Sequence, residues 1–142
     1  MTTVVDASAA IAWCVPDEFD EAAEALLRHV ASGHGIVPAL WAYEMQNALR
    51  NAHRRGRMTE PAIEEVLRRL SRLPLRVVDT SDTPAFQGAF RLAVEHDVSV
   101  YDAVYLEAAR RHRAALASRD ARLLAIASSL NIPHYRANAT DG

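Results

Sequence analysis

Short apolar runs alternate with helical segments along the whole chain, and this order constrains the fold more than any other feature of the sequence. Each run is too short for a helix, while the segments between runs carry apolar residues at helical spacing. Strands that one or two helices separate cannot pair as hairpins, so they need crossover connections and a mostly parallel sheet covered on both faces. We therefore predict an α/β three-layer sandwich with four to five strands, at residues 2–5, 35–38, 75–78, 115–118 and, as a short fifth, 132–135.

The helices are placed by the same spacing and by the residues that begin and end them. Pro16 ends the first helix, and Thr59 with Pro61 gives an N-cap followed by an early proline. We expect helices at residues 7–14, 17–31, 40–55, 60–73, 84–95, 101–112 and 120–130. A chain of 142 residues fits one domain, which we place at residues 1–136, followed by a flexible tail at 137–142.

All 16 basic residues are arginines, and the absence of lysine excludes several kinds of active site. A P-loop nucleotide site, a Schiff-base enzyme and a phosphoaspartyl site each need a lysine ammonium group. The single cysteine, Cys14, excludes an internal disulfide bond and a cysteine-based zinc site. The first residues carry neither a basic stretch nor a long apolar run, so we expect no signal peptide, no membrane span and a cytoplasmic protein.

Two aspartates lie where predicted strands end. Asp6 follows the first strand directly, and Asp120 comes two residues after the fourth. In α/β sheets, ligands bind beyond the carboxyl ends of the strands. Each aspartate also begins a helix, so an ordinary N-cap is the alternative interpretation. Asp79, which follows the third strand, and Asp82, which precedes the next helix, share this pattern without any further sign of function.

Two further acids lie inside predicted helices, where capping explains them less well. Glu44 has mostly apolar residues three and four positions away, so it faces the core or its edge. Asp102 lies near the start of its helix, where the alternative is stabilisation of the helix dipole by about 0.3–1 kcal/mol. No such alternative applies to Glu44.

These four acids are costly unless something compensates their charge. An ionised carboxylate near a core loses hydration, and carboxylates that meet at one place raise each other's pKa. Mg²⁺ or Mn²⁺ removes both penalties, because hard divalent ions prefer carboxylate oxygens and water. Such an ion also suits phosphodiester hydrolysis, since a water bound to it loses its proton more easily. The buried setting of Cys14 and the spacing of the six histidines suggest no other nucleophile or metal site.

Four motifs, taken in order, resemble those of the PIN-domain family and especially of its VapC toxins. They are V-V-D-A-S at residues 4–8, P-x-L-W-x-Y-E-x-x-N-A-L at 38–49, Y-D-A at 101–103 with Y-L-E-A-A at 105–109, and L-A-S-R-D at 116–120. The family often has threonine in place of Ser118. Each motif is weak alone, but all four in order over nearly the whole chain are specific.

The resemblance implies a parallel sheet with helices on both faces and an endoribonuclease that hydrolyses RNA with Mg²⁺ or Mn²⁺. The catalytic residues and metal ligands that it implies are Asp6, Glu44, Asp102 and Asp120. Ser8 and Asn47 would be supporting polar residues. The implied partners are a VapB-like antitoxin, a segment of which would occupy the catalytic groove, and a second copy of the chain in a homodimer.

Arginines close to these acids gain a second interpretation as contacts to the RNA backbone. The candidates are Arg50, Arg54, Arg55, Arg119 and Arg122. The alternative for those near residue 54 is a solvated helix end, where basic side chains favour the helix dipole.

Rival interpretations differ in how well the sequence supports them. A phosphatase that uses a phosphoaspartyl group needs a second aspartate where this chain has Ser8, and it also needs a lysine, so we reject it. Two alternatives stay open: a housekeeping RNA-processing nuclease of the same family, and a non-catalytic module that only binds RNA.

Overall fold

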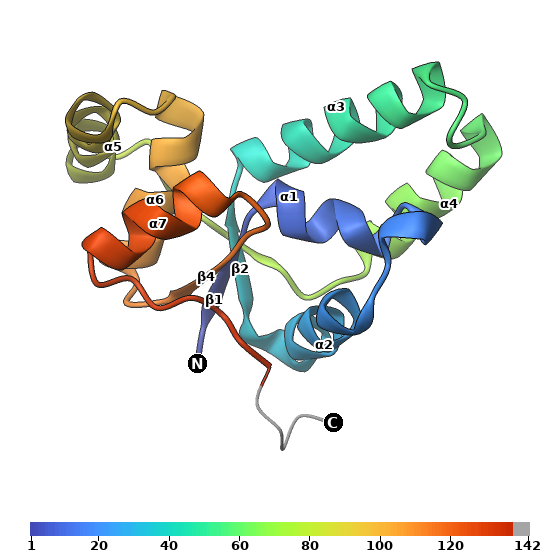
Figure 1. Cartoon of the computed structure of the whole chain (residues 1–142), viewed down its shortest axis with the longest axis horizontal. Helices are drawn as coiled ribbons and strands as arrows, with labels where there is room; N and C mark the ends of the chain where they lie inside the picture. Colours follow the sequence, from blue (N-terminus) through green and yellow to red (C-terminus); the bar gives the residue numbers. More distant parts are fainter. Residues whose placement is uncertain (138–142) are drawn as a thin grey trace.

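A computed structural model describes residues 1–137, and its centre is a four-stranded sheet (Figure 1). The strands are β1 (Thr3–Val5), β2 (Gly35–Pro38), β3 (Arg76–Val78) and β4 (Ala115–Ala117), in the order β3-β2-β1-β4. Every neighbouring pair is parallel. The predicted α/β class and parallel sheet are confirmed.

The predicted fifth strand is reduced to a single bridge beside β4. Leu116 pairs in parallel with His134, its N–H donates to the Pro133 carbonyl at 2.8 Å, and the Tyr135 N–H donates to the Leu116 carbonyl at 2.8 Å. Pro133 has no N–H to add to this ladder, which limits its length.

In the described residues 1–137, seven α-helices lie between and after the strands. They are α1 (Ala7–Ala10), α2 (Glu21–His29), α3 (Leu40–Arg54), α4 (Glu60–Ser71), α5 (Thr83–His96), α6 (Val100–Arg111) and α7 (Ala121–Ser129). A short 3-10 turn, Ile11–Trp13, continues α1, so the helix expected at residues 7–14 is divided.

The single helix expected at residues 17–31 is wrong. A 3-10 turn covers Pro16–Glu18, α2 begins only at Glu21, and a π-helical turn covers Val30–His34. The Asp20 carboxylate accepts a hydrogen bond from the Ala23 N–H at 2.8 Å, which fixes Asp20 as the N-cap. The helix begins later than predicted because the Asp20 side chain satisfies one of the amides at its start that have no partner within the helix.

The sheet lies between two helical layers. In Figure 1, α1 to α4 lie to the right of the strands and α5 to α7 to the left. Helix α6 packs against β1, β2 and β4, and α5 packs on α6. Because both faces are covered, every residue of β1 and β4 is buried.

The carboxyl ends of the strands meet at the upper edge of the sheet in Figure 1, and several helices begin there. Asp6 leads from β1 into α1, Ala39 joins β2 to α3, and Asp120 begins α7. The Arg122 guanidinium donates to the Asp97 carbonyl at 2.6 Å, which holds the turn between α5 and α6 beside α7. This edge therefore collects the segments that carry the predicted site.

The predicted domain bounds and the predicted C-terminal tail are not tested by the fold. The division into a domain at residues 1–136 stays a prediction, and the expected tail at 137–142 falls, apart from Ala137, outside the described residues. Within residues 1–137, no helix is both long and apolar enough to cross a membrane.

Candidate active site

Asp6 is a buried carboxylate that two hydroxyl groups hold. It is 7% exposed, and its Oδ2 atom accepts hydrogen bonds from Ser8 Oγ at 2.6 Å and Ser118 Oγ at 2.7 Å. Although Asp6 stands at the N-cap position of α1, its side chain makes no capping hydrogen bond. Capping therefore does not explain this aspartate.

The same two hydroxyls join α1, where Ser8 lies, to the segment that follows β4. Their oxygens lie 3.2 Å apart, the Arg119 N–H donates to Ser8 Oγ at 2.9 Å, and the Asp120 N–H donates to Ser118 Oγ at 3.0 Å. Sequence reasoning proposed Ser8 as a polar support but overlooked Ser118. Its position at the end of a buried strand, two residues before a candidate acid, was the available signal.

Glu44 is half-buried on α3 and is tied to α6. The Tyr105 hydroxyl donates to Glu44 Oε1 at 2.6 Å, and the Tyr105 side chain is 0% exposed. Loss of hydration raises the pKa of Glu44, and the charges of Asp6 and Asp102 raise it further, while the hydrogen bond from Tyr105 acts in the opposite direction.

Burial also raises the pKa of the Tyr105 hydroxyl, as does its hydrogen bond to Glu44, so this group stays a protonated donor. Tyr105 is a contact that sequence reasoning missed. Its place three residues after Asp102, on the same face of the helix, was the only hint.

Asp102 lies in the first turn of α6, where Ser99 is the N-cap and its Oγ atom accepts a hydrogen bond from the Asp102 N–H at 3.1 Å. The pKa of Asp102 is raised, first by burial and then by the charges of Asp6 and Asp120. Favourable interaction with the helix dipole therefore does not outweigh the opposing effects at this carboxylate.

Asp120 does what the capping alternative predicted. Its Oδ1 atom accepts hydrogen bonds from the Arg122 N–H at 3.0 Å and the Leu123 N–H at 3.1 Å. It nevertheless lies close enough to Asp102 to raise the pKa of that residue. Asp120 therefore both caps α7 and belongs to the group of interacting acids.

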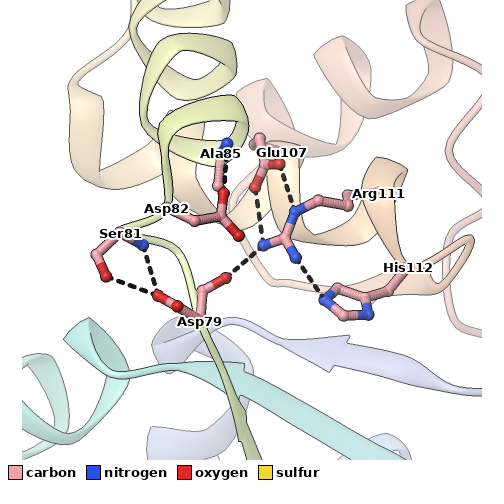
Figure 2. A network of polar contacts seen from close by, with 7 residues as sticks. All are labelled: Asp79, Ser81, Asp82, Ala85, Glu107, Arg111 and His112. Atoms are coloured by element: carbon pink, nitrogen blue, oxygen red, sulfur yellow. Dashed lines mark hydrogen bonds and ion pairs between the residues drawn. The ribbon is translucent and has the colours of Figure 1, made fainter.

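Asp79 and Asp82, whose sequence pattern is the same, behave as ordinary turn and cap residues. Asp79 Oδ1 accepts hydrogen bonds from the N–H and the hydroxyl of Ser81, at 2.8 and 2.7 Å, and Asp82 caps α5 through the Ala85 N–H (Figure 2). Neither affects the pKa of Glu44 or Asp102.

A second buried acid, Glu107, shows how this fold compensates a charge without a metal ion. Arg111 Nε donates to Glu107 Oε1 at 2.7 Å, and Arg111 Nη2 donates to the Asp79 carbonyl at 2.6 Å (Figure 2). Within residues 1–137, by contrast, no arginine or histidine forms an ion pair with Asp6. Two neutral hydroxyls are its hydrogen-bond donors.

The four acids predicted as metal ligands therefore influence one another at one edge of the sheet, but they are not drawn around a common centre. As the side chains lie, no group of three or more His, Cys, Asp or Glu within residues 1–137 is placed to hold an ion. Tyr105 holds Glu44, and the amides of α7 hold one oxygen of Asp120.

The donor set fits Mg²⁺ or Mn²⁺ in its chemistry. All four side chains offer carboxylate oxygens, the ligands that these hard ions prefer. The raised pKa values of Glu44 and Asp102 reflect burial and mutual repulsion, and a divalent cation relieves both.

The predicted RNA-binding residues differ in their surroundings. Arg119 Nη2 pairs with Asp20 at 2.6 Å, and Arg122 bonds the turn before α6. Some exposed side chains of α3 and of its C-cap make no ion pair or hydrogen bond within residues 1–137; among them are Asn47, Arg50, Arg54 and Arg55. Asn47, the second predicted support, therefore has no bond to the acids.

Comparison with known proteins gives the family. The PIN domain family matches residues 3–128, which is most of the chain. The chain belongs to the PIN-domain family. The recognised resemblance is thus confirmed.

One relative of this PIN-domain protein is Ribonuclease VapC3 of Pyrobaculum aerophilum. It is 35% identical over 123 residues, which are 87% of this chain and 92% of the relative. A similar solved structure is the crystal structure of PAE2754, also from Pyrobaculum aerophilum. The two structures superpose with a TM-score of 0.70 at 26% identity, covering 88% of this chain and 84% of the other.

Proposed function

We propose that this PIN-domain protein is an endoribonuclease that hydrolyses RNA phosphodiester bonds with Mg²⁺ or Mn²⁺. One observation carries the proposal: Asp6 is buried without a cationic partner in the described chain, and its charge raises the pKa of both Glu44 and Asp102. Carboxylates that repel one another in a partly buried place lower the stability of the fold, and perturbed pKa values of this kind cluster at functional sites. The relationship to a protein named as a ribonuclease supports RNA as the substrate.

Each acid would have its own part in the reaction. Asp6 and Asp102 would hold the ion, with the Ser8 and Ser118 hydroxyls fixing the orientation of Asp6. Glu44, aligned by Tyr105, and Asp120, aligned by the start of α7, would complete the set or accept a proton from the attacking water. The bound metal would supply an easily deprotonated water and charge stabilisation at the phosphate.

The RNA backbone would run along α3. Arg50, Arg54 and Arg55 are exposed and have no partner within residues 1–137, so they can pair with phosphate groups at little cost. Arg119 and Arg122 can do so only after giving up their bonds to Asp20 and Asp97.

We further propose the biological setting that the relationship to Ribonuclease VapC3 suggests. The protein would be the toxin of a toxin–antitoxin pair, act in the cytoplasm as a homodimer, and be neutralised by a VapB-like antitoxin. A housekeeping RNA-processing nuclease of the same family would use the same residues, and a module that only binds RNA would lack the metal dependence.

A cleavage assay tests the activity. The purified protein should cut total RNA with Mg²⁺ or Mn²⁺ and stop when a chelator is added. Asp6→Asn should abolish cleavage, while Asp79→Asn, at the matching position after β3, should retain it. Full activity in chelator, or in Asp6→Asn, would exclude the proposed chemistry. RNA binding without cleavage would favour the non-catalytic alternative.

A further inference from the structure

Two strongly exposed tyrosines stand beside the acids. Tyr43 precedes Glu44 on α3 and is 71% exposed; Tyr101 precedes Asp102 on α6 and is 65% exposed. The chain has only 4 tyrosines, and with Tyr105 three of them lie on the two helices that carry these acids. Neither exposed ring contributes to the core, so its position calls for another explanation.

The position of Tyr101 on α6 directs it toward α3. Tyr101 and Tyr105 are four residues apart and therefore lie on the same face of α6, one turn from each other. Tyr105 reaches Glu44 of α3 with its hydroxyl. Tyr101 thus lies one turn nearer the open N-terminal end of α6, above the contact that joins the two helices.

Tyr43 begins a row of polar side chains along the outer face of α3. Positions 43, 47, 50 and 54 lie on one side of a helix, and they carry Tyr43, Asn47, Arg50 and Arg54. All four are exposed. At 1.5 Å per residue the row extends about 16 Å away from the acids.

We propose that Tyr43 and Tyr101 stack on unpaired RNA bases on the two sides of the scissile phosphate and so position the strand over the acids. Aromatic rings that alternate with arginines are the usual means of binding a single strand, because every base offers a face to stack on. A duplex keeps its bases stacked inside and gives such rings nothing to bind. This inference rests on the proposed nuclease function.

A protein contact is the competing use for exposed aromatic rings, and α5 offers a clearer example of one. Phe86, Phe90 and Val94 are exposed at spacings of four residues and therefore form an apolar stripe along one face of α5. The two tyrosines instead alternate with carboxylates and arginines, and each carries a polar hydroxyl. Their setting favours nucleic acid over an apolar protein surface.

The test uses fluorescence anisotropy with a labelled single-stranded RNA and a duplex of the same sequence. Variants are made on the Asp6→Asn background, so that RNA survives the titration. Tyr101→Ala and Tyr43→Ala should each weaken single-strand binding by roughly five- to a hundredfold. Tyr101→Phe and Tyr43→Phe keep the ring and should restore binding. Phe86→Ala, an exposed aromatic outside the site, should bind as the parent does.

Three results would overturn the inference. The alanine variants could bind the single strand as tightly as their parent, they could lose duplex binding equally, or they could change the mass in sedimentation, which would place the tyrosines in a protein contact. If the wild type cleaves RNA and any of these results is obtained, the stacking role of the two tyrosines is wrong and the proposed nuclease function stands. If the wild type neither cleaves nor binds RNA, the proposed function is wrong, and the stacking role with it.

Discussion

At the scale of single residues, the site depends on how a buried charge is tolerated. Glu107 is paired with Arg111, as buried acids usually are, whereas within residues 1–137 the side chain of Asp6 is held by the hydroxyls of Ser8 and Ser118 alone. Neutral donors stabilise a carboxylate less than a cation does. The charge of Asp6 is therefore available to a metal ion.

Tyr105 should matter because it orients Glu44. Tyr105→Phe keeps the buried ring and removes only the 2.6 Å hydrogen bond. Removing such a partner typically weakens metal binding or activity by roughly 10- to 100-fold. Calorimetric titration with Mn²⁺ measures the effect, and Tyr43→Phe, an exposed tyrosine one residue from Glu44, serves as the control. Unchanged Mn²⁺ affinity in Tyr105→Phe would show that Glu44 is not held for the metal.

The raised pKa values of Glu44 and Asp102 predict a pH dependence of stability without metal. Because the folded state holds these protons more tightly than the unfolded state, stability is lost as pH rises through the raised pKa values. Thermal unfolding in chelator should therefore show wild-type protein losing stability relative to Glu44→Gln/Asp102→Asn as pH rises above about 4.5. The difference between the two proteins is the readout, since Asp20, Glu65 and Asp79 have lowered pKa values and act in the opposite direction. If the difference in stability between the two proteins were the same at every pH, the pKa values of Glu44 and Asp102 would not be raised in the folded state.

At the scale of elements, periodicity predicted most of the fold. The strand at residues 35–38 was predicted with its observed bounds, and α3, α5 and α6 differ from prediction by a residue or so. These segments are long or fully buried, so local pattern and tertiary packing agree. The helix at 17–31 was wrong because Asp20 caps a later start.

The site was harder to predict than the elements, because its hydrogen bonds join distant parts of the chain. Tyr105 and Glu44 are 61 residues apart, and Ser118 and Asp6 are 112 apart. No local pattern encodes such a contact. Asp6 and Asp120 could be proposed because the strand ends of a parallel sheet converge on one edge, and Glu44 and Asp102 because of their places within helices. The assignment of the four acids as metal ligands stays a prediction.

Helix α6 presents both Asp102 and Tyr105, so its start should influence stability and activity together. Ser99→Ala removes the N-cap and should lower the free energy of unfolding by about 1 kcal/mol. Because Asp102 lies in the turn that Ser99 fixes, RNA cleavage should fall as well. Thr59→Ala removes the cap of α4 and is the matched control: a similar loss of stability with unchanged cleavage. Equal cleavage in the two variants would mean that the start of α6 does not position the site.

At the scale of the whole molecule, the sheet and its two helical layers bring four distant segments to one edge. Residue 6 directly follows the first strand, residues 44 and 102 lie in the third and sixth helices, and residue 120 begins the seventh helix. An ion bound there would link all of them. Metal binding should therefore stabilise the complete fold rather than one loop.

Thermal unfolding with and without Mg²⁺ tests this link. Saturation to about 100 times the dissociation constant should add about 2.7 kcal/mol to the free energy of unfolding of the wild type. Asp6→Asn should be more stable than the wild type in chelator, because it removes repulsion, and should gain little from Mg²⁺. If Mg²⁺ raised the free energy of unfolding of Asp6→Asn as much as that of the wild type, the ion would bind at another place.

The most direct measurement is anomalous diffraction from crystals grown with Mn²⁺, since it locates the ion itself. Our account predicts an anomalous peak at the carboxyl edge of the sheet, in contact with Asp6 and within reach of Glu44, Asp102 and Asp120. A peak at any other place, or none in crystals that contain Mn²⁺ at saturating concentration, would contradict the claim that these four carboxylates share a metal ion.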